Sequence, residues 1–308
     1  MRGMQKQIGS PMGIAMNRRE FSRLIAGAAV AHSVLSYASE SNPPTAPFQL
    51  SVMLWTIDKE RGVERSIEIV AEAGYRGIEL VSEFESWSAQ DTRRIMAEMN
   101  SLGLIFDTID GGGHTLADPD ARRTILEKLA IRMNLARDLG CSQLILTSGN
   151  KVKNLSEQAQ KTAFTDTLKE VGELAGKNDM HIVIEPIDPF ERPDCYLTSV
   201  VQAFEIVRAV NSKNVTVLYD FYHEQQWGGN LITKLEQNIQ LVGLVHVADV
   251  PGRHEPGSGE IDYESIYRKL AELHYNKFIA MEFYPIGDAL QVLKTARLDA
   301  LKAASSIS

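Results

Sequence analysis

The chain has 308 residues, of which 32 are lysine or arginine and 40 are aspartate or glutamate, so its formal net charge is −8. An acidic surface repels phosphate backbones, which argues against a nucleic-acid-binding protein. The length allows one large domain with a sizeable core. Its two cysteines, Cys141 and Cys195, do not require a disulfide, although one would be allowed in an exported protein.

The first forty residues have the pattern of an export signal. Arg18 and Arg19 stand before the apolar run at 24–35, which is typical of a twin-arginine signal and too short for a stable membrane anchor. An uncleaved helix that faces lipid is the alternative. We expect a signal peptide at residues 1–38, a flexible segment at 39–47, and a mature protein that is periplasmic or exported. The true start could be Met1 or Met16.

From residue 48 onward, short apolar runs alternate with longer amphipathic segments about eight times. The expected strands lie at 49–54, 77–81, 104–108, 143–147, 181–185, 215–220, 244–247 and 278–283. The expected helices include 63–73, 91–102, 119–139, 157–178, 199–210, 263–273 and 288–304. Strands that are apolar on both faces indicate a parallel sheet covered by helices. Eight alternations favour an α/β fold, a (β/α)₈ TIM barrel at residues 48–305, over an open doubly wound sheet.

Side chains that bind metals stand at the trailing ends of the last four expected strands: Glu185, Asp220, His246 and Glu282. Because the carboxyl ends of barrel strands meet at one mouth, we expect these four to converge there. Any one of them could instead be a helix cap or a salt-bridge partner, but four in succession favour a site. Such an oxygen-rich ligand set suits Mn²⁺ or Mg²⁺, with Co²⁺ or Zn²⁺ as alternatives.

Two glutamates beside one cation are typical of proton transfer next to a carbonyl group. The cation would stabilise an enediolate, while one carboxylate removes the proton and the other returns it. We therefore expect Glu185 and Glu282 to be catalytic residues as well as ligands, and Asp220 and His246 to be ligands alone. A catalytically inactive barrel that binds sugars or metal is the alternative from a different class.

Further residues that follow strands are candidates for contact with a small-molecule substrate. Arg253 could clamp a carboxylate or a pair of hydroxyls, although a surface salt bridge is the alternative. His223 could face substrate hydroxyls or be a buried histidine bonded to the backbone. Trp55 could form a wall of the pocket. His114 follows three glycines and could be a pocket residue or part of a plain turn, and Glu79 could join the polar rim or pair with an arginine.

The segment at 246–263, HVADVPGRHEPGSGEIDY, resembles the signature loop of the hydroxypyruvate isomerases. Three shorter motifs resemble the metal and base segments of that family, of ketose 3-epimerases and of xylose-isomerase-like barrels: Glu185-Pro, Asp220-x-x-His223 and Met281-Glu282-Phe-Tyr-Pro. The likeness covers about residues 48–300. It implies the same four metal ligands, the two glutamates as bases, and His223 and Arg253 as substrate contacts.

Two residues resemble the epimerases more closely. Bacterial hydroxypyruvate isomerases carry glutamine where His246 stands, and Glu191 resembles a substrate-binding residue of an epimerase pocket. An export signal also differs from an enzyme of glyoxylate metabolism, which works in the cytoplasm. We expect a metal-dependent isomerase of a small hydroxy-carbonyl or sugar substrate. A periplasmic ketose 3-epimerase or 3-keto-sugar lyase is the alternative, and the resemblance also implies that the chain could form a homo-oligomer.

Overall fold

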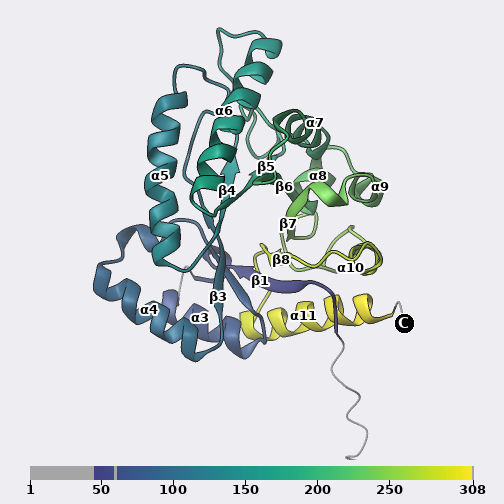
Figure 1. Cartoon of the computed structure of the whole chain (residues 1–308). Helices are drawn as coiled ribbons and strands as arrows, with labels where there is room; N and C mark the ends of the chain where they lie inside the picture. Colours follow the sequence, from purple (N-terminus) through teal and green to yellow (C-terminus); the bar gives the residue numbers. More distant parts are fainter. Residues whose placement is uncertain (1–44, 59–60, 307–308) are drawn as a thin grey trace, which may run out of the picture. The chain divides into compact units, whose positions relative to one another are not determined.

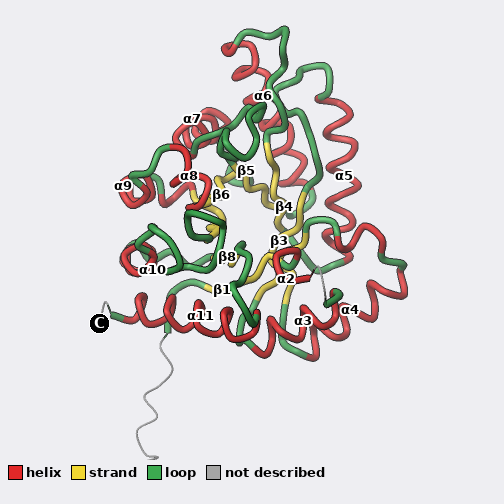
Figure 2. The backbone as a smooth tube through the Cα atoms, turned by 180° about the vertical axis from the view of Figure 1, so that it is seen from behind, coloured by secondary structure: helices red, strands yellow, loops and turns green. Residues whose placement is uncertain are grey.

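The computed structural model describes residues 45–58 and 61–306, which contain a closed barrel of eight parallel strands. Each strand pairs with the next along the chain, and β1 also pairs with β8. The strands form the inner ring and the helices surround them (Figure 2). The (β/α)₈ prediction is therefore confirmed. The strands are β1 Gln49–Met53, β2 Gly77–Leu80, β3 Ile105–Asp110, β4 Gln143–Thr147, β5 His181–Glu185, β6 Val215–Asp220, β7 Val242–Val247 and β8 Phe278–Met281.

The helices that follow the strands cover the outside of the barrel (Figure 1). They bury apolar faces against the strands, because buried positions recur at helical spacing, as at Leu129 and Met133 in α5. The α-helices are α2 Trp55–Asp58, α3 Val63–Glu72, α4 Ala89–Ser101, α5 Arg122–Asp138, α6 Glu157–Lys177, α7 Val200–Val210, α8 Phe221–Trp227, α9 Leu231–Glu236, α10 Tyr263–Glu272 and α11 Ala289–Ser305, with 3₁₀ turns η1 Glu83–Ser86 and η2 Ile239–Leu241.

The core has two parts. The larger one lies between the strands and the surrounding helices. The smaller one fills the inside of the barrel and contains Met53, Ile145, Val183, Leu218 and Leu244, one residue each from five strands. Aliphatic layers of this kind make the interior of a TIM barrel a packed core rather than a pore.

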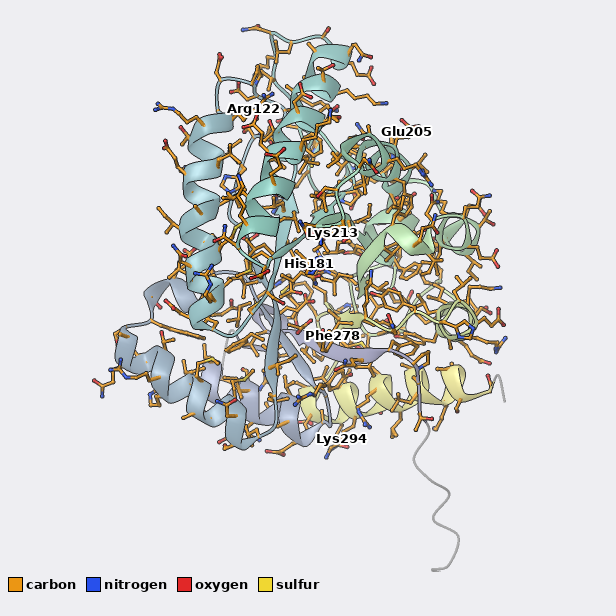
Figure 3. The ribbon with its side chains drawn as sticks, in the orientation of Figure 1. Arg122, His181, Glu205, Lys213, Phe278 and Lys294 are labelled. Carbon is orange, nitrogen blue, oxygen red and sulfur yellow. The ribbon has the colours of Figure 1, made fainter. Side chains whose placement is uncertain are left out.

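The two ends of the barrel differ. At the end where the strands begin there is a cavity of about 420 Å³. Its lining includes His181, Lys213 and Phe278, which are labelled in Figure 3. The other end, where the strands finish, is the mouth at which barrel enzymes place their chemistry.

Some element boundaries differ from the sequence-based expectations. Strand β3 begins one residue later, because the amide of Leu104 bonds to the carbonyl of Met99 in the turn that ends α4. Strand β7 begins earlier, because Val242 already pairs with Val217. Two short helices, α8 and α9, stand between β6 and β7, where the sequence pattern named none.

The predicted signal peptide lies outside the described residues. In the part of the chain that the structure describes, no helix is long and apolar enough to cross a membrane. Cys141 and Cys195 are both buried and are free thiols, so they do not form a disulfide with each other.

Candidate active site at the barrel mouth

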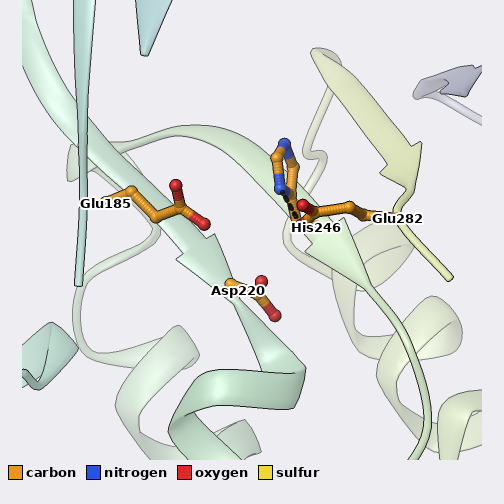
Figure 4. A group of neighbouring side chains, drawn as sticks. All are labelled: Glu185, Asp220, His246 and Glu282. Carbon is orange, nitrogen blue, oxygen red and sulfur yellow. Dashed lines mark hydrogen bonds and ion pairs between the residues drawn. The ribbon is translucent and has the colours of Figure 1, made fainter. Parts of the chain in front are cut away.

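The four expected ligands do meet at the mouth. Glu185 and Asp220 are the last residues of β5 and β6, His246 is the last but one of β7, and Glu282 directly follows β8. Each offers a ligand atom, and these atoms all lie within 4.8 Å of one another. The four side chains point toward a common centre (Figure 4). Glu282 continues the ladder, because its amide bonds to the carbonyl of Val247 at 3.1 Å.

This donor set fits a divalent cation. It combines three carboxylates with one imidazole, and all four residues are buried, with at most 7% of each exposed. Buried carboxylates are unfavourable unless a positive charge accompanies them. Oxygen-rich sites with one imidazole suit an octahedral cation such as Mn²⁺ or Mg²⁺.

The two glutamates have opposite electrostatic surroundings. Burial, followed by the charge of Glu282, raises the pKa of Glu185 to about 8. Burial alone would raise the pKa of Glu282 as well, but Arg253 and His246 beside it hold that pKa below its ordinary value. Neighbouring carboxyl groups whose pKa values are pushed apart are typical of a general acid and a general base.

His246 lies between two carboxylates. Its Nδ1 is 2.9 Å from Oε2 of Glu282, and its Nε2 is 2.9 Å from Oε2 of Glu79. Burial alone would lower the pKa of His246, but these two carboxylates raise it well above the usual value. The sequence left two options for Glu79, a place on the polar rim or an arginine partner. The contact with the imidazole is neither of these.

Asp220 has two roles in the fold. Its Oδ1 accepts hydrogen bonds from the amides of Tyr222 and His223, at 2.7 and 3.3 Å, and so caps α8. Its Oδ2 lies 3.6 Å from Nε2 of His223 and 4.0 Å from Nη2 of Arg253. The sequence left a helix cap and a metal ligand as alternative roles for Asp220. One carboxylate can fill both roles, because its two oxygens face different partners.

A second group of acidic and imidazole side chains stands beside the first and consists of Asp188, Glu191 and His223. His223 is buried, and its Nδ1 lies 2.7 Å from Oδ2 of Asp188. Burial alone would lower the pKa of His223, but Asp220 and Asp188 raise it to about 9. Asp188 was not singled out by the sequence pattern, although it follows Glu185 by three residues.

Arg253 joins the four ligands to the rim. Its Nη2 is 2.9 Å from Oε1 of Glu282, and its Nη1 is 3.0 Å from Oε2 of Glu191. The guanidinium carbon stands 5.7 Å from the ring centre of Trp55 and 5.1 Å from that of Tyr222. Four of the expected substrate residues, Trp55, Glu191, His223 and Arg253, therefore border the group of ligands. Their contact with substrate remains a prediction.

His114 is held by its own loop. It is buried, and its Nε2 lies 3.1 Å from the carbonyl oxygen of Gly111. Burial lowers the pKa of this imidazole. The backbone of His114 packs against the loop after β4, where a Cβ on Gly149 would lie 2.0 Å from the His114 carbonyl oxygen. Its role as a substrate contact stays a prediction.

The comparisons with known proteins agree on one family. Residues 67–298 match the model of the xylose isomerase-like TIM barrel family. Hydroxypyruvate isomerase from Escherichia coli K12 is 25% identical over 224 residues, which cover 71% of this chain and 86% of that protein. The 2-oxo-tetronate isomerase of Haemophilus influenzae is 28% identical over 232 residues, which cover 72% of this chain and 88% of that protein.

Solved structures share the fold at lower identity. The 3-keto-D-glucoside 4-epimerase of E. coli superposes with a TM-score of 0.69 at 18% identity, covering 81% of this chain and 97% of that one. The IolI protein with a bound zinc atom superposes with a TM-score of 0.72 at 19% identity, covering 85% and 99%. The family model matches well over half of the residues of this chain, so the chain belongs to the xylose isomerase-like TIM barrel family.

Proposed function

We propose that this protein is a metal-dependent isomerase of a small hydroxy-carbonyl or sugar substrate, similar in chemistry to hydroxypyruvate isomerase. The observation that carries the proposal is the meeting of two buried glutamates with Asp220 and His246 at the barrel mouth. Relatives named hydroxypyruvate isomerase and 2-oxo-tetronate isomerase support the same reaction class.

In this proposal Glu185, Asp220, His246 and Glu282 hold the cation. When bound, a divalent cation would act as a Lewis acid and make the proton next to a carbonyl easier to remove. One glutamate takes the proton from the hydroxyl-bearing carbon beside the carbonyl, and the other delivers a proton to the former carbonyl carbon, while the hydroxyl proton passes to the former carbonyl oxygen. Arg253, which is charged and borders Glu282, orients a carboxylate or a pair of hydroxyls on the substrate.

A second candidate keeps the site and changes the substrate. It is the epimerisation of a ketose at C3, or elimination on a 3-keto sugar. The observation that favours it is the group of Glu191, Arg253 and His223 at the rim, where a longer sugar would place hydroxyl groups. His246 in place of glutamine points the same way.

Incorporation of deuterium from solvent tests the proposal and separates its two forms. Protein loaded with Mn²⁺ is incubated in D₂O with hydroxypyruvate, with free ketoses and with 3-keto glycosides, and each carbon is followed by NMR. For the isomerase we expect label at the carbonyl carbon or the adjacent hydroxyl-bearing carbon, which are C2 and C3 of hydroxypyruvate and C1 and C2 of a ketose. For the epimerase we expect label at C3 of a ketose.

Two variants show whether the glutamates carry the exchange. Glu185→Gln and Glu282→Gln should each lower label incorporation by at least about 100-fold, because general acid–base catalysis contributes that much, while circular dichroism stays unchanged. Glu205→Gln, which alters only an exposed ion pair with Lys161, is the matched control and should retain full activity. Full incorporation in either site variant would contradict the two-glutamate scheme.

We also propose that the mature protein is exported through the twin-arginine route. The support is the Arg18–Arg19 pair ahead of an apolar run. Cell fractionation measures this, with lysine replacing both arginines as the control. We expect the wild-type protein outside the cytoplasm and the variant inside it, whereas a purely cytoplasmic wild-type protein would refute export.

A further inference from the structure

Glu79 is a charged residue inside the barrel, away from solvent. It belongs to β2, where it is fully buried, and its side chain reaches His246 on β7, a strand that does not pair with β2. A carboxylate in such a place is unfavourable unless a partner compensates its charge. The carboxyl oxygen Oε2 of Glu79 lies 2.9 Å from Nε2 of His246, and Asp107 on β3 is a second buried neighbour of the carboxyl group.

The orientation of His246 is defined by contacts on both of its nitrogens. Nδ1 faces Glu282, and Nε2 faces Glu79. An imidazole binds a cation through a nitrogen that carries no proton, so the other nitrogen must hold the ring proton. A carboxylate next to Nε2 keeps the proton on that atom and leaves Nδ1 available on the side of the ligand group.

The surroundings of Glu79 hold its side chain within the barrel interior. Ser51, on β1, and Asp107 and Thr108, on β3, are buried polar residues of the two adjacent strands, and Thr108 is the register partner of Glu79. Asp107 packs against Gly77, two residues before Glu79, where a Cβ would lie 2.5 Å from Oδ1 of Asp107. Burial, followed by the charge of Glu79, raises the pKa of Asp107 well above its usual value.

We propose that Glu79 is a positioning residue of the metal centre, whose carboxylate fixes the ring of His246 so that Nδ1 faces a divalent cation. The inference rests on the proposed function, because it presupposes a cation held by Glu185, Asp220, His246 and Glu282. It adds to the metal centre a residue from β2, a strand that carries none of the four ligands, and it explains why a charged side chain occupies the inside of β2.

Metal affinity tests this assignment without relying on catalysis. Apo-protein is titrated with Mn²⁺ in a calorimeter, and the visible absorption of the Co²⁺-loaded protein is recorded. Glu79→Leu removes the acceptor for the proton on Nε2. We expect the affinity of this variant for Mn²⁺ to be about 10- to 100-fold lower than that of the wild type, which is the usual loss when a partner of a metal-bound histidine is removed. Glu79→Gln keeps an oxygen that can accept the same proton, so its affinity should lie between those of the wild type and Glu79→Leu, with a shifted Co²⁺ spectrum.

A matched control separates positioning from loss of stability. Glu224 is also a buried glutamate, but its Oε1 pairs with Lys234 and its Oε2 accepts a hydrogen bond from the amide of Val200, so both oxygens have partners outside the group of four ligands. Glu224→Gln should lower the thermal unfolding temperature of the apo-protein and leave the Mn²⁺ affinity and the Co²⁺ spectrum unchanged.

The outcomes distinguish this inference from the proposed function. If the wild-type protein binds no divalent cation, both are overturned. If the wild type binds Mn²⁺ and both Glu79 variants bind it with equal affinity and the same Co²⁺ spectrum, only the role of Glu79 is overturned. Should Glu79→Leu fail to fold, Glu79→Gln alone decides between the two results.

Discussion

Arg253 is the side chain whose contacts bear most directly on substrate binding. It is a partner of both Glu282 and Glu191, and its guanidinium stands over the rings of Trp55 and Tyr222. Burial alone would lower the pKa of Arg253, but Glu282 and Asp220 raise it, so the group remains charged at any pH in use. A planar, permanently charged fork suits a substrate carboxylate or a pair of hydroxyls.

Arg253→Lys should raise KM and lower kcat/KM about 10- to 100-fold, because lysine offers a point charge without the fork or the flat face for stacking. The fall corresponds to roughly 1.4–2.8 kcal/mol, the range of a hydrogen bond to a charged group. Steady-state kinetics on the substrate found by deuterium incorporation measures it. Arg268→Lys, which changes an exposed pair with Glu264, is the control. Unchanged kinetics in Arg253→Lys would remove this residue from the binding site.

Individual residues were predictable where the pattern of the chain alone decides their place. Glu185, Asp220, His246 and Glu282 come at or next to strand ends, and parallel strands bring their ends together. The contact of Glu79 with His246 was not predictable, because it joins β2 to β7 across the barrel interior. Such a contact depends on the closure of the barrel and on side-chain directions that sequence spacing does not contain.

At the scale of elements, the loop between β7 and α10 is the one that places Arg253 at the mouth. Asp249, fully buried, organises it: Oδ1 accepts from the amides of Val250 and Ile261, and Oδ2 accepts from the amide of Gly257. The amide of Arg253 bonds in turn to the carbonyl of Asp249. The sequence marked this loop through its resemblance to a known signature, but it did not reveal that one carboxylate holds it together.

Asp249→Asn should loosen this loop, because an amide nitrogen cannot accept the hydrogen bond that Oδ2 accepts from Gly257. We expect the free energy of unfolding to fall by about 1–3 kcal/mol, the effect of leaving a buried polar group unpaired, and KM to rise as Arg253 loses its position. Denaturant unfolding and steady-state kinetics measure the two effects. Asp262→Asn in the same loop is the control, since asparagine caps a helix as well as aspartate does. Equal behaviour of the two variants would show that Asp249 does not organise the loop.

The barrel elements themselves follow from the sequence more readily than their limits do. The alternation of apolar runs and amphipathic segments was enough to predict all eight strands. Boundaries shifted where a turn bond or a ladder contact decided the first residue, as Leu104 with Met99 before β3 and Val242 with Val217 at the start of β7. The short helices α8 and α9 bury few residues and so leave a weak periodic signal.

At the scale of the whole molecule, a cation held by β5, β6, β7 and the residue after β8 would tie together half of the barrel. A ligand that binds only the folded state stabilises it, by about 2.7 kcal/mol at a concentration 100 times Kd. For a domain of this size that corresponds to a rise of roughly 5–10 °C in Tm. Calorimetric scans with Mn²⁺ and with a chelator should show this difference, and His246→Ala should abolish most of it. Equal Tm values with and without metal would contradict a cation bound at this site.

The location of the cation is the most direct test of the account. A crystal of the protein grown with Mn²⁺ and measured at the manganese absorption edge gives an anomalous peak wherever the ion binds. We expect one peak per chain, bounded by Glu185, Asp220, His246 and Glu282. A peak at the neighbouring group of Asp188, Glu191 and His223 instead, or no peak at the mouth, would contradict it.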